Sequence, residues 1–448
     1  DAMSWRTWFA VALCSVVYFL DGLLPAMLGP LAPNIAQSLN LGPAELGPVF
    51  SGTIVGQAIG LVIVPMFARY IGHKNIIILS VIGFGFMQAA TYFVQAHDVL
   101  ISIRILEGFF IGGGYPSCIV IVTAIVPQKH RGIGVMLLFV GLALGSTMAG
   151  VVSRWFVTGE LWRTAFAITG LATMCMALVV WKFLNVDVSD TPEEPDEEPR
   201  KFRDIGKPPL LWGTLLLWLI YTCSFAVFYC ITYWMPSMLV GLGRSPEIAA
   251  YAAASFNFGG LIALLMVGLL IDRYGAIRIL SLAYLLAAVL FFFDGRFINE
   301  LGDMPLLILL ATTGFFILGG YAGVNVVLVS YYPAELRGLG AGWAKSVGRV
   351  INISTPVLIG IALARGAAEQ DLLSMFALPA GMVATALLAI GYLKKEMTIA
   401  FEVSYAGNAL LMKKGHHRLA INRAVKRAIE ERQFDTLSEH MFITGMRG

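Results

Sequence analysis

A few ionisable residues lie inside otherwise apolar segments of this chain. Asp21 stands in the first such segment, and Arg104 and Glu107 stand three positions apart in the fourth. Lys345 and Arg349 stand in the eleventh. A charge at the centre of a bilayer costs on the order of 3 kcal/mol on insertion scales, so ionisable side chains at this depth usually face a partner or a pathway. These residue types therefore predict ion pairing, anion capture and proton transfer inside a membrane.

The three cations, Arg104, Lys345 and Arg349, are candidates for binding an anion. A guanidinium group matches a carboxylate in a bidentate geometry, and a low local dielectric constant strengthens the contact. Lys345, Arg349 and Asn352 are spaced i, i+4 and i+7, which places them on one face of a helix. The excess of cations over carboxylates in these segments favours an anionic substrate, and such a substrate can carry two carboxylates.

Several of these polar residues also have a structural interpretation. Arg104 can pair with Glu107, because residues three apart are neighbours on a helix surface. Lys345 lies early in its segment, where it can act in a gate or extend to the membrane surface. Asn257 and Asn325 lie deep in the eighth and tenth segments, where a buried amide either binds substrate or joins another helix.

Asp21 is the first candidate for carrying a proton. Burial favours the neutral form of a carboxyl group, and a nearby cation favours the charged form. An anion that arrives at the cation can therefore switch the protonation of the carboxyl group and couple the two fluxes. Glu107 is the second candidate, and a fixed structural pair between Asp21 and a cation is the alternative.

Aromatic residues crowd the seventh apolar segment. Tyr221, Phe225 and Phe228 are spaced i, i+4 and i+7 and form a stripe that can stack on a flat ring. Tyr229 and Trp234 follow in the same segment. A tyrosine hydroxyl can donate a hydrogen bond to a phenol or a carboxylate, but packing between helices explains such a stripe equally well.

The composition of the chain is that of a membrane protein. Of its 448 residues, 58% are hydrophobic and 13% are charged, with a mean hydropathy of +0.78, whereas soluble proteins carry about 25% charged residues. A net charge of +3 gives no reason to expect a nucleic-acid partner. The histidines lie outside the apolar segments and the cysteines have no metal-ligand spacing, so we expect no metal; without a nucleotide-binding motif, we expect no cofactor.

Twelve apolar segments are long enough to cross a bilayer, which takes about 20 residues. The first is too long for a cleavable signal peptide. These segments predict an all-α membrane protein with twelve transmembrane helices. They run over residues 8–36, 46–68, 75–96, 98–126, 132–157, 163–184, 210–240, 246–271, 276–296, 304–332, 338–364 and 370–394.

The polar segments divide the chain into parts. Residues 185–209 are rich in Pro and acidic residues and predict a solvated linker between a six-helix bundle at 1–184 and another at 210–394. Residues 395–448 form a tail with an amphipathic stretch near Arg418–Arg432. Lys and Arg concentrate in the gaps after the even-numbered spans, so the linker, the tail and both termini are expected in the cytoplasm.

The two predicted bundles share an internal repeat. Gly113, Gly114 and Tyr115 recur 206 positions later as Gly319, Gly320 and Tyr321. The same offset relates four more pairs: Gly108 and Gly314, Pro127 and Pro333, Arg131-Gly132 and Arg337-Gly338, and Gly134 and Gly340. Pseudo-symmetric bundles of this kind are typical of secondary transporters, which bind substrate between the repeats near the membrane midplane.

Twelve spans, a charged central linker and this repeat resemble the major facilitator superfamily. The loop after the eighth span carries Gly268, Asp272-Arg273, Gly275 and Arg278, which is similar to the superfamily's loop signature. In the first half the corresponding loop has Arg69 where the signature has Asp. The resemblance implies gating roles for Arg69, Arg131, Asp272, Arg273 and Arg337.

Within the superfamily, the chain resembles the aromatic acid/proton symporter family. The resemblance rests on Asp21-Gly22 with Pro33, Arg104 with Gly112-Gly113-Gly114-Tyr115-Pro116, Tyr233-Trp234-Met235-Pro236, Asn257-Phe258-Gly259-Gly260 and Gly348-Arg349 with Pro356. Leu24 stands where that family usually has a second Asp.

This resemblance implies proton-coupled uptake of an aromatic carboxylate across the bacterial inner membrane by alternating access, by a monomer. The alternative is a proton-coupled carrier or exporter of non-aromatic organic anions such as small dicarboxylates. A sensory role of the tail is a further alternative. The spans contain no pattern of a membrane-embedded enzyme.

Overall fold

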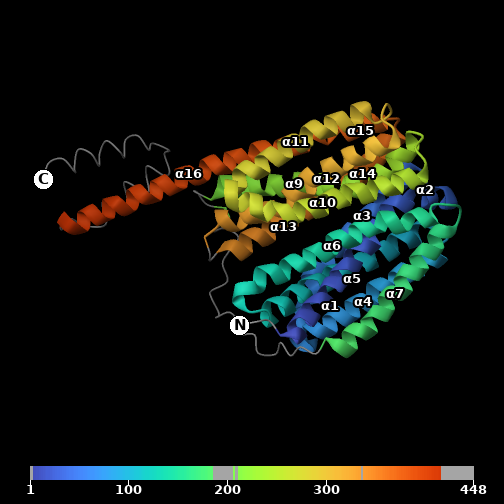
Figure 1. Cartoon of the computed structure of the whole chain (residues 1–448), viewed down its shortest axis with the longest axis horizontal. Coiled ribbons are helices and arrows are strands. Elements are labelled where there is room, and N and C mark those ends of the chain that lie inside the picture. The colour runs from blue at the N-terminus through green and yellow to red at the C-terminus, as the bar shows by residue number, and fades with distance from the viewer. Residues whose placement is uncertain (1–3, 185–204, 207–209, 334–335, 415–448) are drawn as a thin grey trace.

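The computed structural model describes residues 4–184, 205–206, 210–333 and 336–414, and the side chains of these except residues 65, 69 and 396–414. Every regular element in these ranges is helical (Figure 1). The N-terminal helices are α1 (Trp5–Ala26), α2 (Leu28–Leu39), α3 (Pro43–Ile71), α4 (His73–Ala90), η1 (Thr91–Phe93), α5 (His97–Ile125), η2 (Gln128–His130), α6 (Arg131–Ser153), η3 (Arg154–Phe156) and α7 (Leu161–Phe183). The C-terminal helices are α9 (Leu211–Gly241), α10 (Pro246–Tyr274), α11 (Ala276–Phe297), α12 (Asp303–Tyr331), α13 (Arg337–Asn352), α14 (Thr355–Ala364), α15 (Glu369–Met375) and α16 (Ala377–Lys414).

These helices make 12 candidate membrane spans within the described ranges, six before residue 185 and six after residue 209. The predicted all-α class is confirmed, and the spans agree with the apolar segments to within a few residues at most ends. Three spans contain a break between two α-helices, and the twelfth breaks between α15 and α16 at Phe376. The first breaks between α1 and α2 at Met27, which is flanked by Pro25 and Pro30. The eleventh breaks between α13 and α14, just before Pro356. Proline lacks the N–H that a continuous helix needs, so a break beside it is expected.

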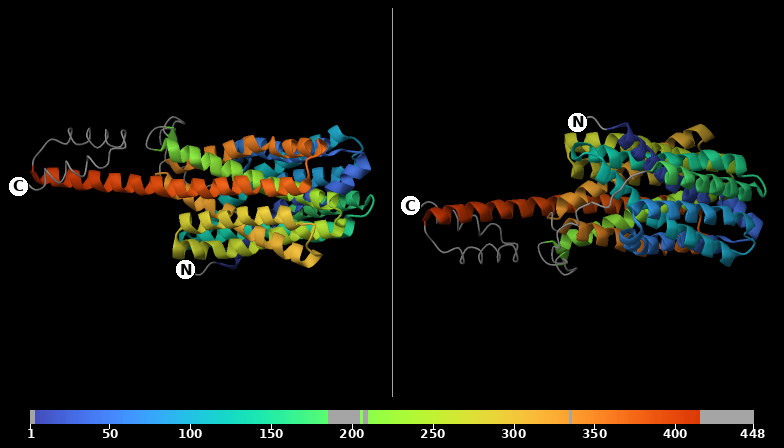
Figure 2. Two further views of the ribbon diagram at one scale, coloured as in Figure 1. Left: turned by 90° about the horizontal axis from the view of Figure 1, so that it is seen from above. Right: turned by 90° about the horizontal axis from the view of Figure 1, so that it is seen from below.

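The last helix is longer than its apolar segment. α16 continues to Lys414, beyond the predicted end of the span at Lys394, and projects from the bundle (Figures 1 and 2). The first part of the predicted tail is therefore helical. The amphipathic stretch at Arg418–Arg432 and most of the linker at 185–209 lie outside the described residues.

Glycines bring paired helices into close contact in the same way in both halves. A Cβ on Gly56 of α3 would overlap the carbonyl oxygen of Ile105 on α5. A Cβ on Gly259 of α10 would overlap the carbonyl oxygen of Ala311 on α12. Ile105 and Ala311 are related by the 206-residue offset, so the repeat is a repeat of helix packing. Small residues are typical at such contacts in membranes, where they let backbones approach.

The two halves pack against each other at the end of the molecule remote from the N-terminus and α16 (Figure 1). There the backbone of α2 at Gly29 contacts Thr232 of α9, and Gly47 of α3 contacts Val357 of α14. Phe50 stacks on Tyr233 with ring centroids 5.2 Å apart. We call this set of contacts the seam.

The glycine contacts yield a stability prediction. We expect Gly56→Leu and Gly259→Leu each to lower the unfolding temperature of the detergent-purified protein, because overpacking a tight contact costs about 1–3 kcal/mol or more. The measurement is thermal unfolding with size-exclusion chromatography. Gly381→Leu on α16 is the matched control, since a Cβ there meets nothing within 4 Å. Equal unfolding temperatures for all three variants would contradict this account of the packing.

Candidate functional site

Arg349 forms no ion pair within 4.0 Å among the residues that the structure describes. It lies near the end of α13, part-exposed, and its buried Nε makes no hydrogen bond within the described part of the chain. Its guanidinium carbon lies 5.7 Å from the centroid of the Phe225 ring on α9. The guanidinium is also within hydrogen-bonding reach of the Tyr229 hydroxyl. An arginine in this setting can accept an anion.

Asp21 of the N-terminal half acts electrostatically on Arg349 of the C-terminal half. Neither residue belongs to an ion pair within 4.0 Å among the described residues. Gly22, the next residue, packs against the backbone of Leu142 on α6, which fixes the height and rotation of α1 at this point. The carboxyl group therefore lies close enough to influence the cation but does not neutralise it by contact.

An aromatic cluster that contains Phe225 lies beside the guanidinium of Arg349. Phe225 is stacked on Tyr229 with centroids 5.8 Å apart and lies 5.5 Å from Tyr321 of α12. Phe228 is stacked on Tyr321 at 5.9 Å. Three of the aromatic residues proposed from sequence, Phe225, Phe228 and Tyr229, thus gather beside the cation.

Tyr115 and Tyr321 belong to the same cluster, although sequence reasoning did not single them out. Both lie near Arg349, and they are related by the 206-residue offset. Tyr115 is held in place by Tyr18, whose hydroxyl donates to its carbonyl oxygen at 3.0 Å and whose ring stacks on it at 4.9 Å. The repeat itself was the signal, because equivalent positions of two bundles face each other across their common axis.

Lys345 lies one turn before Arg349 on the same helix, part-exposed, and the two positive charges interact. The structure thus places a second cation beside the first. This arrangement leaves both roles of Lys345 open, anion binding and gating.

Arg104 and Glu107 form an internal pair away from Arg349. Arg104 Nη1 lies 2.5 Å from Glu107 Oε2, and both side chains are fully buried. Arg104 also donates to Gln88 and Thr91 and lies over the ring of Phe166. The guanidinium is thereby directed between α4, α5 and α7 of the N-terminal half, and its charge is already matched. The intrahelical pairing considered from sequence is the arrangement that the structure shows.

Most of the other polar candidates hold helices together. Asn352 donates to the carbonyls of Thr222 and Gly348 and accepts from Thr355, at 2.7–2.9 Å. Asn325 accepts a hydrogen bond from the buried Tyr221 at 2.9 Å, which ties α12 to α9.

Two further candidates also have protein partners. Asn257 bonds to Ala253 within α10. Trp234 donates to Pro356 at 3.2 Å and packs on Phe50 in the seam. The structure does not bring either of them to Arg349.

The loop residues lie apart from this cluster. Arg131 donates to the carbonyl of Val126 and Arg337 to that of Tyr332, at 3.4 and 3.3 Å, which repeats one contact in both halves. Asp272 and Arg273 are exposed at the end of α10. The side chain of Arg69 lies outside the described set. These positions fit loop contacts, and their gating role stays a prediction.

One buried carboxyl group was absent from the sequence-based candidates. Asp294, 1% exposed near the end of α11, accepts a hydrogen bond from Thr313 of α12 at 2.9 Å. The charged candidates from sequence were sought in the middle of the apolar segments, whereas Asp294 lies near the end of one.

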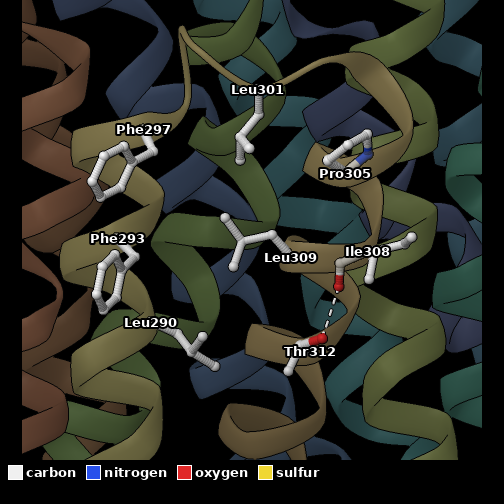
Figure 3. A pocket seen from close by; sticks show the side chains of 8 residues that line it. All are labelled: Leu290, Phe293, Phe297, Leu301, Pro305, Ile308, Leu309 and Thr312. Carbon is white, nitrogen blue, oxygen red and sulfur yellow. Dashed lines mark hydrogen bonds between the residues drawn. The ribbon is translucent and has the colours of Figure 1, made fainter.

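An apolar groove lies between α11 and α12 (Figure 3), and none of its lining residues belongs to the Arg349 cluster. Its volume is about 520 Å³, and it is lined by Leu290, Phe293, Phe297, Leu301, Pro305, Ile308, Leu309 and Thr312. The hydroxyl of Thr312 is bonded to the carbonyl of Ile308 at 2.8 Å. A groove of this composition suits hydrocarbon and gives no group that would bind an anion.

Twelve membrane-spanning helices in two packed halves, with charged and aromatic residues gathered where the halves meet, define a polytopic transporter. The sequence profile of the Major Facilitator Superfamily matches residues 14–292 and 217–404. The chain therefore belongs to the Major Facilitator Superfamily.

Similar proteins include several named transporters. The chain is 27% identical over 422 residues to the gallate transporter of Pseudomonas putida, covering 88% of this chain and 94% of that protein. It is 28% identical over 373 residues to the 4-hydroxybenzoate transporter PcaK of the same species, covering 76% and 83%. It is 28% identical over 369 residues to the 3-(3-hydroxy-phenyl)propionate transporter of Escherichia coli, covering 82% and 89%.

Solved structures agree on the fold. A D-xylose-proton symporter superposes with a TM-score of 0.70 at 14% identity, covering 85% of this chain and 97% of that chain. An inward-facing bacterial homolog of the human lysosomal transporter Spinster superposes with a TM-score of 0.63 at 16% identity, covering 88% and 95%.

The internal pairing of Arg104 predicts a stability effect. We expect Glu107→Gln to lower the unfolding temperature strongly, because removing one partner of a buried pair costs about 3–5 kcal/mol. The double variant Arg104→Met/Glu107→Leu should recover most of the loss, since it removes both charges. Thermal unfolding of the purified variants measures both effects. A Glu107→Gln variant as stable as the unmodified protein would contradict the structural role.

Proposed function

We propose that this chain carries an aromatic carboxylate together with a proton across the bacterial inner membrane, by alternating access. The observation that carries the proposal is the setting of Arg349: a part-exposed side chain with a buried, unpartnered Nε, beside the ring of Phe225 and the aromatic cluster to which that ring belongs. A carboxylate satisfies the guanidinium, and an aromatic ring stacks on its surroundings. The names of the similar transporters, for gallate and 4-hydroxybenzoate, support the same substrate class.

Asp21 is the proposed proton carrier. The cation whose charge acts on it, Arg349, is the one that the substrate would occupy. When the substrate carboxylate neutralises Arg349, the Asp21 carboxylate loses the charge that stabilises it and takes up a proton. The loaded site is then close to neutral, and a neutral site is cheaper to enclose within a membrane than a charged one.

Alternating access is the proposed route. The seam joins the two halves at one end of the molecule, and α16 projects from the opposite end. In the proposed conformation the site opens toward the end from which α16 projects. The excess of Lys and Arg in the even-numbered gaps supports placing that end in the cytoplasm, with both termini. The working unit of the proposal is a monomer, since each chain holds Asp21 and Arg349.

The direct test is uptake into proteoliposomes under an inward proton gradient. The panel contains benzoate, 4-hydroxybenzoate, a benzene dicarboxylate and matched aliphatic mono- and dicarboxylates. We expect gradient-dependent uptake of the aromatic members. Uptake of the aliphatic acids alone would replace the proposal with a carrier of non-aromatic organic anions. A stronger preference for the dicarboxylate would assign Lys345 to the second carboxylate.

Arg349 gives the first functional prediction. We expect Arg349→Gln to lower kcat/KM for the aromatic carboxylate by about 100-fold or more, because a charge-assisted bidentate contact is lost. Arg349→Lys should keep part of the activity. Arg365→Gln, in the exposed loop after α14, is the control and should behave as the unmodified protein. Uptake by Arg349→Gln at the normal rate would remove the anion site from this residue.

Asp21 gives the second functional prediction. We expect Asp21→Asn to lose accumulation driven by a proton gradient but to keep exchange of labelled for unlabelled substrate, because an amide cannot carry the proton. Both assays use the same proteoliposomes. Gradient-driven accumulation by Asp21→Asn, with its loss in a folded Glu107→Gln variant, would move the role to Glu107.

A further inference from the structure

Gln57 lies on α3 of the N-terminal half, directly across from the Arg349 cluster. Its Oε1 accepts a hydrogen bond from the Tyr229 hydroxyl of α9 at 3.4 Å. The Arg349 guanidinium is within reach of the same hydroxyl. Tyr229 therefore donates to Gln57 across the two halves, and the Arg349 guanidinium lies near the same hydroxyl.

The main chain of Gln57 has little freedom to move. A Cβ on Gly112 of α5 would lie 2.5 Å from the carbonyl oxygen of Gln57 and 3.0 Å from the Cα of Gln57. A Cβ on Gly108 would lie 3.0 Å from the backbone nitrogen of Gln57. Both glycines belong to the close contact of α3 with α5. A side chain on so fixed a backbone is well suited to discriminate between ligands.

The amide of Gln57 has unused hydrogen-bonding capacity. Its contact with Tyr229 is long for an O–H···O hydrogen bond, which is usually about 2.7–2.8 Å. Its Nε2 group, a donor of two hydrogen bonds, has no protein partner in the described ranges. The side chain is part-exposed, as are Arg349 and Tyr321. A ligand can therefore reach it.

The distance between Gln57 and Arg349 indicates which part of a ligand would contact Gln57. Gln57 and Arg349 both contact one hydroxyl group, so the two lie within about 6–7 Å of each other, given a hydrogen bond of about 3 Å on the Arg349 side. That separation is on the scale of one aromatic ring. A ring held by its carboxylate at Arg349 can present a second polar substituent to Gln57.

We propose that Gln57, positioned with Tyr229, is the specificity-determining residue that recognises a ring hydroxyl of the substrate. Its Nε2 donates to the hydroxyl oxygen and its Oε1 accepts the hydroxyl proton, so one amide satisfies both functions of a phenol. This inference rests on the proposed transport of an aromatic carboxylate by Arg349. It predicts that the protein distinguishes hydroxybenzoates from benzoate through the N-terminal half.

The test compares KM values for uptake of benzoate, 3-hydroxybenzoate and 4-hydroxybenzoate by the full chain in proteoliposomes. The unmodified protein should prefer at least one hydroxybenzoate. Gln57→Leu should raise the KM for that acid by about 10-fold or more, because the ring hydroxyl loses its hydrogen-bond partner. The same variant should leave the KM for benzoate unchanged or lower it. Tyr229→Phe should reduce the same preference. Gln95→Leu, on the exposed loop before α5, is the matched control and should change neither value.

The outcomes separate this inference from the proposed function. Failure of the unmodified protein to transport any of the three acids would overturn the proposed function. Transport without a preference for a hydroxyl, or a Gln57→Leu variant that shifts all three KM values alike, would overturn the role of Gln57 alone. If Gln57→Leu does not fold, the Tyr229→Phe variant is the test. An unchanged preference of Tyr229→Phe for the hydroxybenzoate over benzoate would overturn the role of Gln57.

Discussion

A guanidinium group held inside a membrane without a fixed counter-ion is the constraint on which this structure depends. Arg104, which is fully buried, is matched by Glu107 in contact. Arg349 instead has Asp21 across the interface, close enough to act on it but outside ion-pair contact. Such a cation is costly unless something neutralises it. In the proposed mechanism the Asp21 carboxylate offsets this charge in the empty protein, and the substrate carboxylate does so in the loaded protein, in which Asp21 carries the proton.

The remainder of the fold positions these two charges on opposite halves. Glycine contacts such as Gly56 with Ile105, and Gly22 with Leu142, lock each half into a rigid unit. The halves meet through the seam at one end, where rings and backbone pack tightly. Two rigid bodies that share one seam can rock about it, and Asp21 and Arg349 lie on opposite sides of that movement. A charge pair split between two such bodies is well placed to couple substrate binding to their motion.

Much of the fold could be predicted from sequence, because a bilayer imposes length and polarity on every span. The break at Met27 followed from Pro25 and Pro30, and the pairing of Arg104 with Glu107 from their spacing. The site was harder. Asn352 lies on the same face as Arg349, yet it bonds to Thr222 of a neighbouring helix. Gln57 and Tyr321 carry no charge and gave no signal of their own. Which neighbour a side chain meets depends on the rotation of each helix within its bundle, and hydropathy does not encode that rotation.

The central claim is that the substrate carboxylate and the Asp21 carboxylate compete for the influence of one cation, so that substrate binding leads Asp21 to take up a proton. Calorimetric titration of the purified protein with an aromatic carboxylate, in two buffers of different ionisation enthalpy, counts the protons exchanged on binding. The account predicts uptake of close to one proton per substrate bound by the unmodified protein, and none by Asp21→Asn. Binding without proton uptake by the unmodified protein, or with equal uptake by Asp21→Asn, would contradict it.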